Sequence, residues 1–146
     1  MKTHIILASH GSLAEGMVTA VRMVIRDMAD AIFAFGLDRW ETPQAIRAEA
    51  EAIVKRNPED QHLILCDIKG GSVANDLMPL CVQPGVFVIT GMNLAMVISL
   101  VLQSQSGAVL NRTILEGYLE EVANGICCFD AGDFKETNQE GDGELW

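Results

Sequence analysis

Short apolar runs alternate with amphipathic stretches along most of the chain. The apolar runs predict four buried strands, at residues 3–9, 31–36, 62–67 and 86–90. Between and after them, apolar residues recur at the spacing that one face of a helix requires. Alternating strands and helices form parallel βαβ units, and continuous apolar runs indicate strands that are buried on both faces. The pattern therefore predicts an α/β, doubly wound sheet of four parallel strands with helices on both faces.

The predicted helices begin at sequence signals for N-caps. Residues 12–15 and 113–116 each have the Ser/Thr-x-x-Glu pattern of a capping box. Thr42 stands before a proline, and Asn93 precedes a very apolar segment, so both are predicted N-caps. A further short helix is expected to begin near Ser72.

The pattern changes near the C-terminus. Residues 126–129 (ICCF) predict a last, short strand. Residues 130–146 carry six acidic residues, one basic residue and three glycines without periodicity, which is typical of a flexible tail. We therefore divide the chain into one domain over residues 1–129 and an acidic tail over residues 130–146.

Composition and charge narrow the possible functions. The chain has 146 residues, of which 49% are apolar and 21% charged, as expected for one globular domain. Its net charge of −10 argues against nucleic acid and anionic membranes as partners, since both are bound mainly by Lys and Arg. The four cysteines include no C-x-x-C pair, and the N-terminus lacks a signal-peptide pattern. These two features predict free thiols and a cytoplasmic location.

Two side chains capable of chemistry follow the first and third predicted strands. Ligands of doubly wound sheets bind at the carboxyl ends of the strands, where the strand order reverses. The common order 2-1-3-4 makes these two strands neighbours at that point, which brings His10 close to Asp67. Asp67 could accept a hydrogen bond from one imidazole nitrogen and leave the other free as a nucleophile, base or ligand.

Glycines and a serine accompany this pair. Gly11 leaves the imidazole unshielded, while Gly70, Gly71 and Ser72 supply backbone amides, a hydroxyl and a helix start that can bind an anion. A nucleophilic nitrogen, a carboxylate and an anion cradle together predict a histidine that carries a phosphoryl group. The alternatives are a structural histidine, an Asp67 that caps its own loop, and an ordinary Gly-Gly-Ser turn.

The other two histidines occupy the opposite ends of the same strands. His4 and His62 begin the first and third predicted strands. We expect both to be structural and too far from His10 to share a metal ion with it, so no metal site is predicted.

Three segments resemble one known family, the IIA domain of the mannose-type phosphoenolpyruvate-dependent sugar phosphotransferase system. Residues 8–16 (ASHGSLAEG) are similar to its histidine loop. Residues 67–75 (DIKGGSVAN) are similar to its Asp-x-x-Gly-Gly-Ser-x-x-Asn loop, and residues 90–96 (TGMNLAM) to its Gly-x-Asn-Leu-Pro-Met helix start. The resemblance covers residues 3–129 in the same order.

The resemblance implies a flavodoxin-like fold and a homodimer that exchanges a C-terminal strand, here residues 126–129. It implies that His10 accepts a phosphoryl group from the histidine phosphocarrier protein HPr. His10 would pass this group to a IIB component, here a separate chain, for sugar uptake by membrane components IIC and IID. Asp67 would hold the imidazole, and Ser72 with nearby amides would bind the phosphoryl oxygens. Neither a metal nor an organic cofactor is implied.

Some positions depart from the family pattern or bear on its partners. Lys69 stands where the family usually has an apolar residue, so it either adds a positive charge at the rim of the site or is a solvated loop lysine. Leu13, Lys69 and Met92 are the predicted partner contacts. Ala95 replaces the usual proline, with little consequence for the site. The identity of the sugar is not encoded, since the IIA domain does not contact it.

Several other functions are compatible with parts of the pattern. A tetrapyrrole metal chelatase can also begin with a His-Gly-Ser loop, but needs a second histidine that faces the same cavity. The phosphotransferase subunit of a dihydroxyacetone kinase shares the fold and the histidine. A Ser/His/Asp hydrolase would lack the G-x-S-x-G elbow here, and a non-enzymatic binding module remains if His10 is inert.

Overall fold

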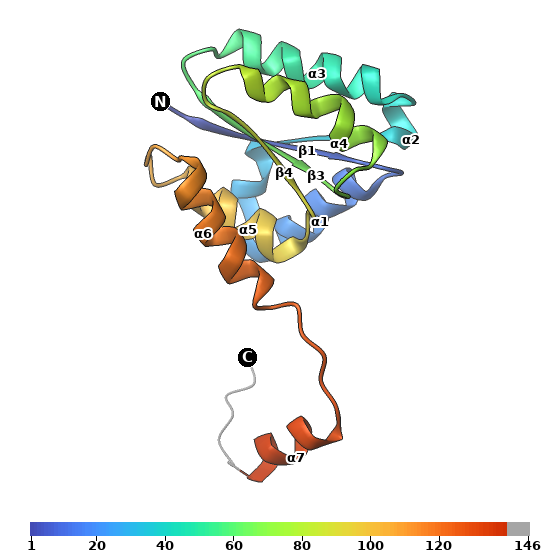
Figure 1. Cartoon of the computed structure of the whole chain (residues 1–146), viewed down its shortest axis with the longest axis vertical. Helices are drawn as coiled ribbons and strands as arrows, with labels where there is room; N and C mark the ends of the chain where they lie inside the picture. Colours follow the sequence, from blue (N-terminus) through green and yellow to red (C-terminus); the bar gives the residue numbers. More distant parts are fainter. Residues whose placement is uncertain (140–146) are drawn as a thin grey trace.

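The computed structural model describes residues 1–139, and its sheet has the predicted topology. Four parallel strands lie in the order β2-β1-β3-β4 (Figure 1). They are β1 (Thr3–Ser9), β2 (Ile32–Gly36), β3 (Gln61–Cys66) and β4 (Val86–Thr90). Each strand lies within one residue of its predicted bounds. The α/β, flavodoxin-like fold with order 2-1-3-4 is therefore confirmed.

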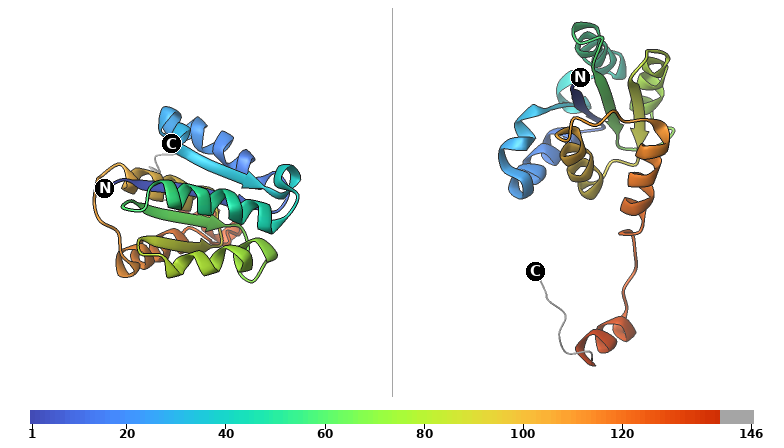
Figure 2. Two further views of the ribbon diagram at one scale, coloured as in Figure 1. Left: turned by 90° about the horizontal axis from the view of Figure 1, so that it is seen from above. Right: turned by 90° about the vertical axis from the view of Figure 1, so that its left-hand side faces the viewer.

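Helices cover both faces of this sheet (Figure 2). One face packs against α1 (Leu13–Ile25), the 3₁₀ segment η1 (Arg26–Ala31), α5 (Leu94–Ser104) and α6 (Arg112–Ala123). The other packs against α2 (Leu37–Trp40), α3 (Pro43–Arg56), α4 (Ser72–Leu77) and the 3₁₀ segment η2 (Met78–Val82). Within residues 1–139, no helix combines the length and the apolar character needed to cross a membrane.

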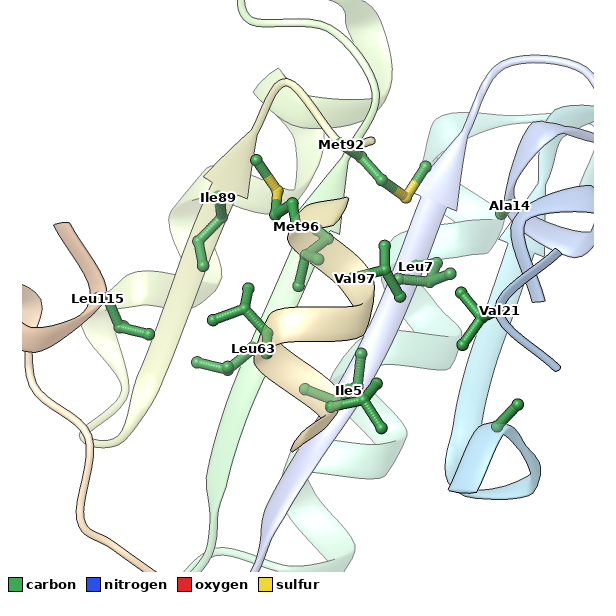
Figure 3. Close-up of a cluster of buried hydrophobic side chains, with 14 of the residues drawn as sticks. Ile5, Leu7, Ala14, Val21, Leu63, Ile89, Met92, Met96, Val97 and Leu115 are labelled. Carbon is green, nitrogen blue, oxygen red and sulfur yellow. The ribbon is translucent and has the colours of Figure 1, made fainter. Parts of the chain in front are cut away.

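The sheet separates two apolar cores, because successive side chains of a strand point to opposite faces. Ile5 and Leu7 of β1 belong to the core under α1 and α5, whereas Ile6 belongs to the core under α3 and α4. Figure 3 shows the first core, where Val97 of α5 lies close to Leu7. Every residue of the central strand β3 is buried, which explains why its sequence shows no polar alternation.

Two of the predicted helix caps are present and a third is displaced. Thr42 accepts a hydrogen bond from the N–H of Ala45, and Asn93 accepts one from the N–H of Met96, as expected. The capping box predicted at residues 113–116 is wrong, because Asn111 caps α6 by accepting from the N–H of Ile114. Asparagine is the stronger N-cap residue and comes first along the chain.

The C-terminal segment differs from the expectations. Residues 126–129 have irregular backbone and pair with no strand within the described chain, so the exchanged strand is not confirmed. Residues 131–139 form a helix, α7 (Ala131–Gln139), where a flexible tail was predicted. Asp130 begins it, since its side chain accepts from the N–H of Gly132. The rest of the predicted tail, residues 140–146, lies outside the described residues.

Candidate active site

His10 and Asp67 meet at the carboxyl ends of β1 and β3. One carboxylate oxygen, Asp67 Oδ2, accepts hydrogen bonds from both the backbone N–H and the ring Nδ1 of His10, each at 2.8 Å. The other oxygen, Oδ1, accepts from the backbone N–H of Ile68 at 3.0 Å. The neighbouring strands place the two residues together, because Ala8 is paired with Cys66 in the sheet register. The structure thus brings the two predicted residues into direct contact.

The surroundings of Asp67 favour its ionised form. Burial by itself would raise the pKa of Asp67, but the hydrogen bonds from His10, the charge of its ring and the N–H of Ile68 outweigh burial. The pKa of Asp67 therefore lies below its usual value. An ionised Asp67 can only accept hydrogen bonds, so the proton between them resides on Nδ1 of His10.

This tautomer determines what His10 offers to a ligand. With Nδ1 donating to Asp67, the lone pair of the neutral ring lies on Nε2, which has no hydrogen-bond partner within residues 1–139. The His10 side chain is 46% exposed, whereas that of Asp67 is only 6% exposed. A buried, ionised carboxylate thus orients a ring whose reactive nitrogen can be reached from solvent.

The glycine-rich loop before α4 lies against this ring. A Cβ on Gly71 would approach Cε1 of His10 to 3.2 Å, so a glycine is what allows the loop to come this close. Gly70 has a φ of +77°, a conformation that favours glycine, and its carbonyl accepts from the side chain of Asn75 at 3.2 Å. The first intrahelical bond of α4 joins the N–H of Asn75 to the carbonyl of Gly71. The amide of the exposed Ser72 precedes that bond and is therefore available to a ligand, whereas Val73 is fully buried.

Residues 90–96, the third segment that resembles the family, pack against the end of β3, which precedes Asp67. The N–H of Met92 donates to the carbonyl of Cys66 at 3.0 Å, which holds the turn after β4 against the end of β3. The Met92 side chain is only 7% exposed and belongs to the core in Figure 3, so it offers a partner little surface, and the contact predicted for it stays a prediction. Leu13 is 47% exposed and Lys69 is also exposed, as a partner contact requires.

The start of α1 is capped differently from the prediction. Ser12 makes no side-chain cap, and Glu15 does not bond back to it, so the capping box at residues 12–15 is wrong. Instead, the fully buried Ser9 accepts from the N–H of Ala14 at 2.7 Å through its hydroxyl oxygen. The carboxylate of Glu15 accepts from the N–H of Gly36 at 2.8 Å. Both contacts cross between elements, so local spacing could not reveal them.

The amino end of the sheet holds the other two histidines, far from His10 along the strands, as predicted. His4 Nε2 lies 2.8 Å from Asp60 Oδ2, and the His4 ring stacks on His62 with the ring centroids 5.0 Å apart. Neither ring nitrogen of His62 has a hydrogen-bond partner within the described chain. No cluster of three His, Cys, Asp or Glu side chains in residues 1–139 could hold a metal ion.

A groove follows the open edge of the sheet, away from His10. It has a volume of about 560 Å³ and lies along β4, between the side chains of Cys81 and those of α6, including Leu115 and Leu119. Strand β4 is an edge strand, so one row of its backbone N–H and C=O groups faces this groove rather than another strand.

Known proteins resemble the chain in sequence and in structure. The family model described as PTS system fructose IIA component matches residues 4–114. The mannose/sorbose-specific IIA subunit of the phosphotransferase system from Enterococcus faecalis is 27% identical, with a TM-score of 0.72 over 89% of this chain and 96% of that chain. Phosphotransferase system component EIIA from Streptococcus agalactiae is 20% identical, with a TM-score of 0.76 over 87% of this chain and 97% of that chain. No curated protein matches the sequence significantly.

Proposed function

The chain belongs to the family of PTS system fructose IIA components, and from this premise we propose that it is a phosphoryl carrier whose reactive group is His10. As a IIA component it takes part in a sugar phosphotransferase system. The observation that carries the proposal is the hydrogen bond from His10 Nδ1 to the buried Asp67, which leaves Nε2 free on an accessible ring.

The proposed reaction is a reversible transfer between two nucleophiles. Nε2 of His10 attacks the phosphorus of the phosphohistidine on HPr, and the new N–P bond forms as the bond to HPr breaks. The electron pair of the broken bond returns to the imidazole of HPr. Asp67 stabilises the positive charge that develops on the His10 ring, while the proton on Nδ1 stays in place. The same steps in reverse pass the group to a nucleophilic side chain of a IIB component.

The loops around His10 supply the groups that would bind phosphoryl oxygens. Gly71 lets its loop lie against the ring, and Gly11 and Gly70 add no side chains to the two loops. The amide and the hydroxyl of Ser72, at the start of α4, follow in the same loop. Hydrogen-bond donors directed at a developing negative charge stabilise the transition state. No metal ion or organic cofactor takes part in this proposal.

Exposed side chains around His10 form the proposed docking surface for HPr and IIB. Leu13, at the start of α1, offers an apolar contact, and Lys69 offers a positive charge beside the phosphoryl group. Ile68 is 57% exposed in the same loop and adds a second apolar side chain that sequence reasoning did not single out. The sugar would be taken up by membrane components IIC and IID, which act after IIB. The chain itself would act in the cytoplasm.

We also propose a homodimer in which residues 126–129 pair with β4 of a second copy. The groove along β4 supports this arrangement, because it offers an unpaired strand edge beside Leu115 and Leu119 of α6. Ile126 is 78% exposed and Phe129 is 76% exposed in the single chain, so docking would remove two large apolar side chains from water. A monomer at micromolar concentration in analytical ultracentrifugation would contradict this dimer.

Phosphorylation of the intact protein tests the proposed function. We expect incubation with phosphoenolpyruvate, enzyme I and HPr to add one acid-labile phosphoryl group per chain, detected by intact mass and located on His10 by fragmentation. Addition of a IIB component should then remove the label. A protein that stays unlabelled would contradict the proposal. Metal insertion into a porphyrin-like ring would favour a chelatase, and transfer to a dihydroxyacetone kinase would favour that enzyme's phosphotransferase subunit.

A further inference from the structure

Glu15 connects the helix that follows His10 to the end of a different strand. It lies in the first turn of α1, but its Oε1 accepts a hydrogen bond from the N–H of Gly36, which is the last residue of β2, at 2.8 Å. Its Oε2 is buried and has no hydrogen-bond partner among residues 1–139. A glutamate in a first helical turn commonly interacts with the amides of its own helix. This one makes a tertiary contact instead.

Gly36 is the point at which this carboxylate meets the loop that carries His10. Its φ of −103° is open to any residue, so the glycine is required by space and not by conformation. A Cβ there would overlap the carbonyl oxygen of Gly11 and Oε2 of Glu15. Only a glycine allows the Glu15 carboxylate and the Gly11 carbonyl to approach β2 together.

The same carbonyl fixes the residue that follows His10. The oxygen of Gly11 accepts a hydrogen bond from the N–H of Asp38 at 3.1 Å, and Gly11 itself has a φ of +50°. On the other side of His10, Ser9 is paired with Gly36 in the β1–β2 register. The β2 end and the start of α2 therefore hold the backbone both before and after His10.

We propose that Glu15 and Gly36 are positioning residues for His10. They hold the backbone of Gly11 in the one arrangement from which the imidazole reaches Asp67 with Nδ1, so that Nε2 remains the free nitrogen. Reactive groups lose rate when the residues that support them let them move by a fraction of an ångström. The inference rests on the proposed function for its kinetic consequence, but the ring tautomer is independent of it.

The test compares four variants of the full chain with the unaltered protein. Glu15→Ala removes the bond to Gly36, whereas Glu15→Gln keeps an acceptor at Oε1. Gly36→Ala places a methyl group against the carbonyl of Gly11. The matched control is Asp60→Ala, which removes a carboxylate that accepts a backbone N–H, that of Lys2, at the opposite end of the sheet. Folding is checked by circular dichroism, and measurements are made well below the lowest melting temperature.

The ring tautomer of His10, read from ¹⁵N chemical shifts, is the first measurement. We expect Nδ1 to carry the proton in the unaltered protein, in Glu15→Gln and in Asp60→Ala. Glu15→Ala and Gly36→Ala should show a mixture of the two tautomers. A folded Glu15→Ala and a folded Gly36→Ala that both keep the original tautomer would overturn the inference, whether or not the protein carries phosphate.

The rate of phosphorylation by phospho-HPr is the second measurement. Glu15→Ala and Gly36→Ala should be about 10-fold slower, and Glu15→Gln and Asp60→Ala should be within about twofold of the unaltered protein. If Glu15→Ala fails to fold, Glu15→Gln still provides a test, because that variant keeps the bond to Gly36. A 10-fold lower phosphorylation rate in Glu15→Gln would overturn the inference. An unaltered protein that accepts no phosphoryl group refutes the proposed function and leaves the tautomer measurement to decide about Glu15.

Discussion

Residues 1–139 contain two histidine–aspartate pairs with equal N···O distances, one at each end of the sheet. At the amino end, His4 Nε2 lies 2.8 Å from Asp60 Oδ2, and at the carboxyl end His10 Nδ1 lies 2.8 Å from Asp67 Oδ2. The His4 side chain is 18% exposed and stacks on His62, whereas that of His10 is 46% exposed. The His4–Asp60 pair is therefore mostly buried, whereas the His10–Asp67 pair exposes its imidazole ring to solvent.

The difference shows that a histidine–aspartate hydrogen bond is not by itself a reactive site. The pKa of Asp60 lies below its usual value because the N–H of Lys2 and the ring of His4 bond to it, so both aspartates are held in the charged form. Of the two rings, only that of His10 has a glycine, Gly71, against it and the start of a helix in the adjoining loop. The surrounding backbone, and not the pair, determines which histidine can accept a ligand.

The largest expected effect comes from removal of the two histidines in turn. His10→Ala should abolish acid-labile phosphorylation by phospho-HPr, because the nucleophile is gone. His4→Ala should retain full labelling and should only lower the melting temperature. Intact mass after labelling provides the measurement. The distinction between the two pairs would fail if His10→Ala carried the label or if His4→Ala lost it while folded.

Removal of the two aspartates in turn should also affect phosphorylation differently, with a smaller effect than removal of the histidines. Asp67→Ala should slow phosphorylation by about 100-fold, since the ring loses both its tautomer and its support for positive charge. Asp60→Ala should leave the rate unchanged and should lower only the melting temperature. Single-turnover kinetics with phospho-HPr measure both rates. Equal rates for Asp67→Ala and the unaltered protein would remove Asp67 from the mechanism.

A glycine near each pair allows a finer comparison. Gly71→Ala places a Cβ 3.2 Å from Cε1 of His10, so the ring must shift by a few tenths of an ångström, and phosphorylation should slow by about 10-fold. Gly85→Ala, at the amino end, places a Cβ 3.1 Å from the carbonyl of Asp60 at a φ of +77°. It should lower the melting temperature and leave the rate unchanged. A slower phosphorylation rate in Gly85→Ala would show that the amino end of the sheet is coupled to the site at its carboxyl end.

The smallest expected effect concerns stability and pH at the amino end. Burial, together with the nearby charge of His4, lowers the pKa of His62 below its usual 6.5. The unfolded chain then binds a proton that the folded protein does not, so the free energy of unfolding should fall as pH drops below about 6.5. This stability is fully present above pH 6.5.

His62→Leu tests that prediction directly. The variant should be more stable by about 1 kcal/mol at pH 7, because it removes two buried nitrogens without partners. It should also lose less stability between pH 7 and 5 than the unaltered protein, as urea denaturation at each pH would show. If the free energy of unfolding changed with pH equally in the two proteins, His62 would not be the source of the pH dependence. Phosphorylation should be unaffected, since His62 lies at the far end of β3.

Much of this architecture was predictable because it depends on short-range patterns. The strands were predicted to within one residue, since short apolar runs such as Val86–Thr90 are typical of strands that other elements cover. Thr42 and Asn93 were correct as caps because a cap and its acceptor lie three residues apart. The helix α7 was missed, because its start depends on the local turn at Asp130 and its sequence has no apolar face.

Some features of the candidate site could likewise be predicted from the sequence, and others could not. The sequence by itself determined that His10 and Asp67 follow neighbouring strands, because parallel strands bring their carboxyl ends to one edge of a sheet. Only the tertiary structure decided that Nδ1 faces Asp67, that Met92 is buried, and that Glu15 bonds to Gly36 instead of capping its own helix. These outcomes depend on distances between segments that are remote in the chain. No local spacing contains those distances, because only the packing of α1 and β2 against β1 sets them.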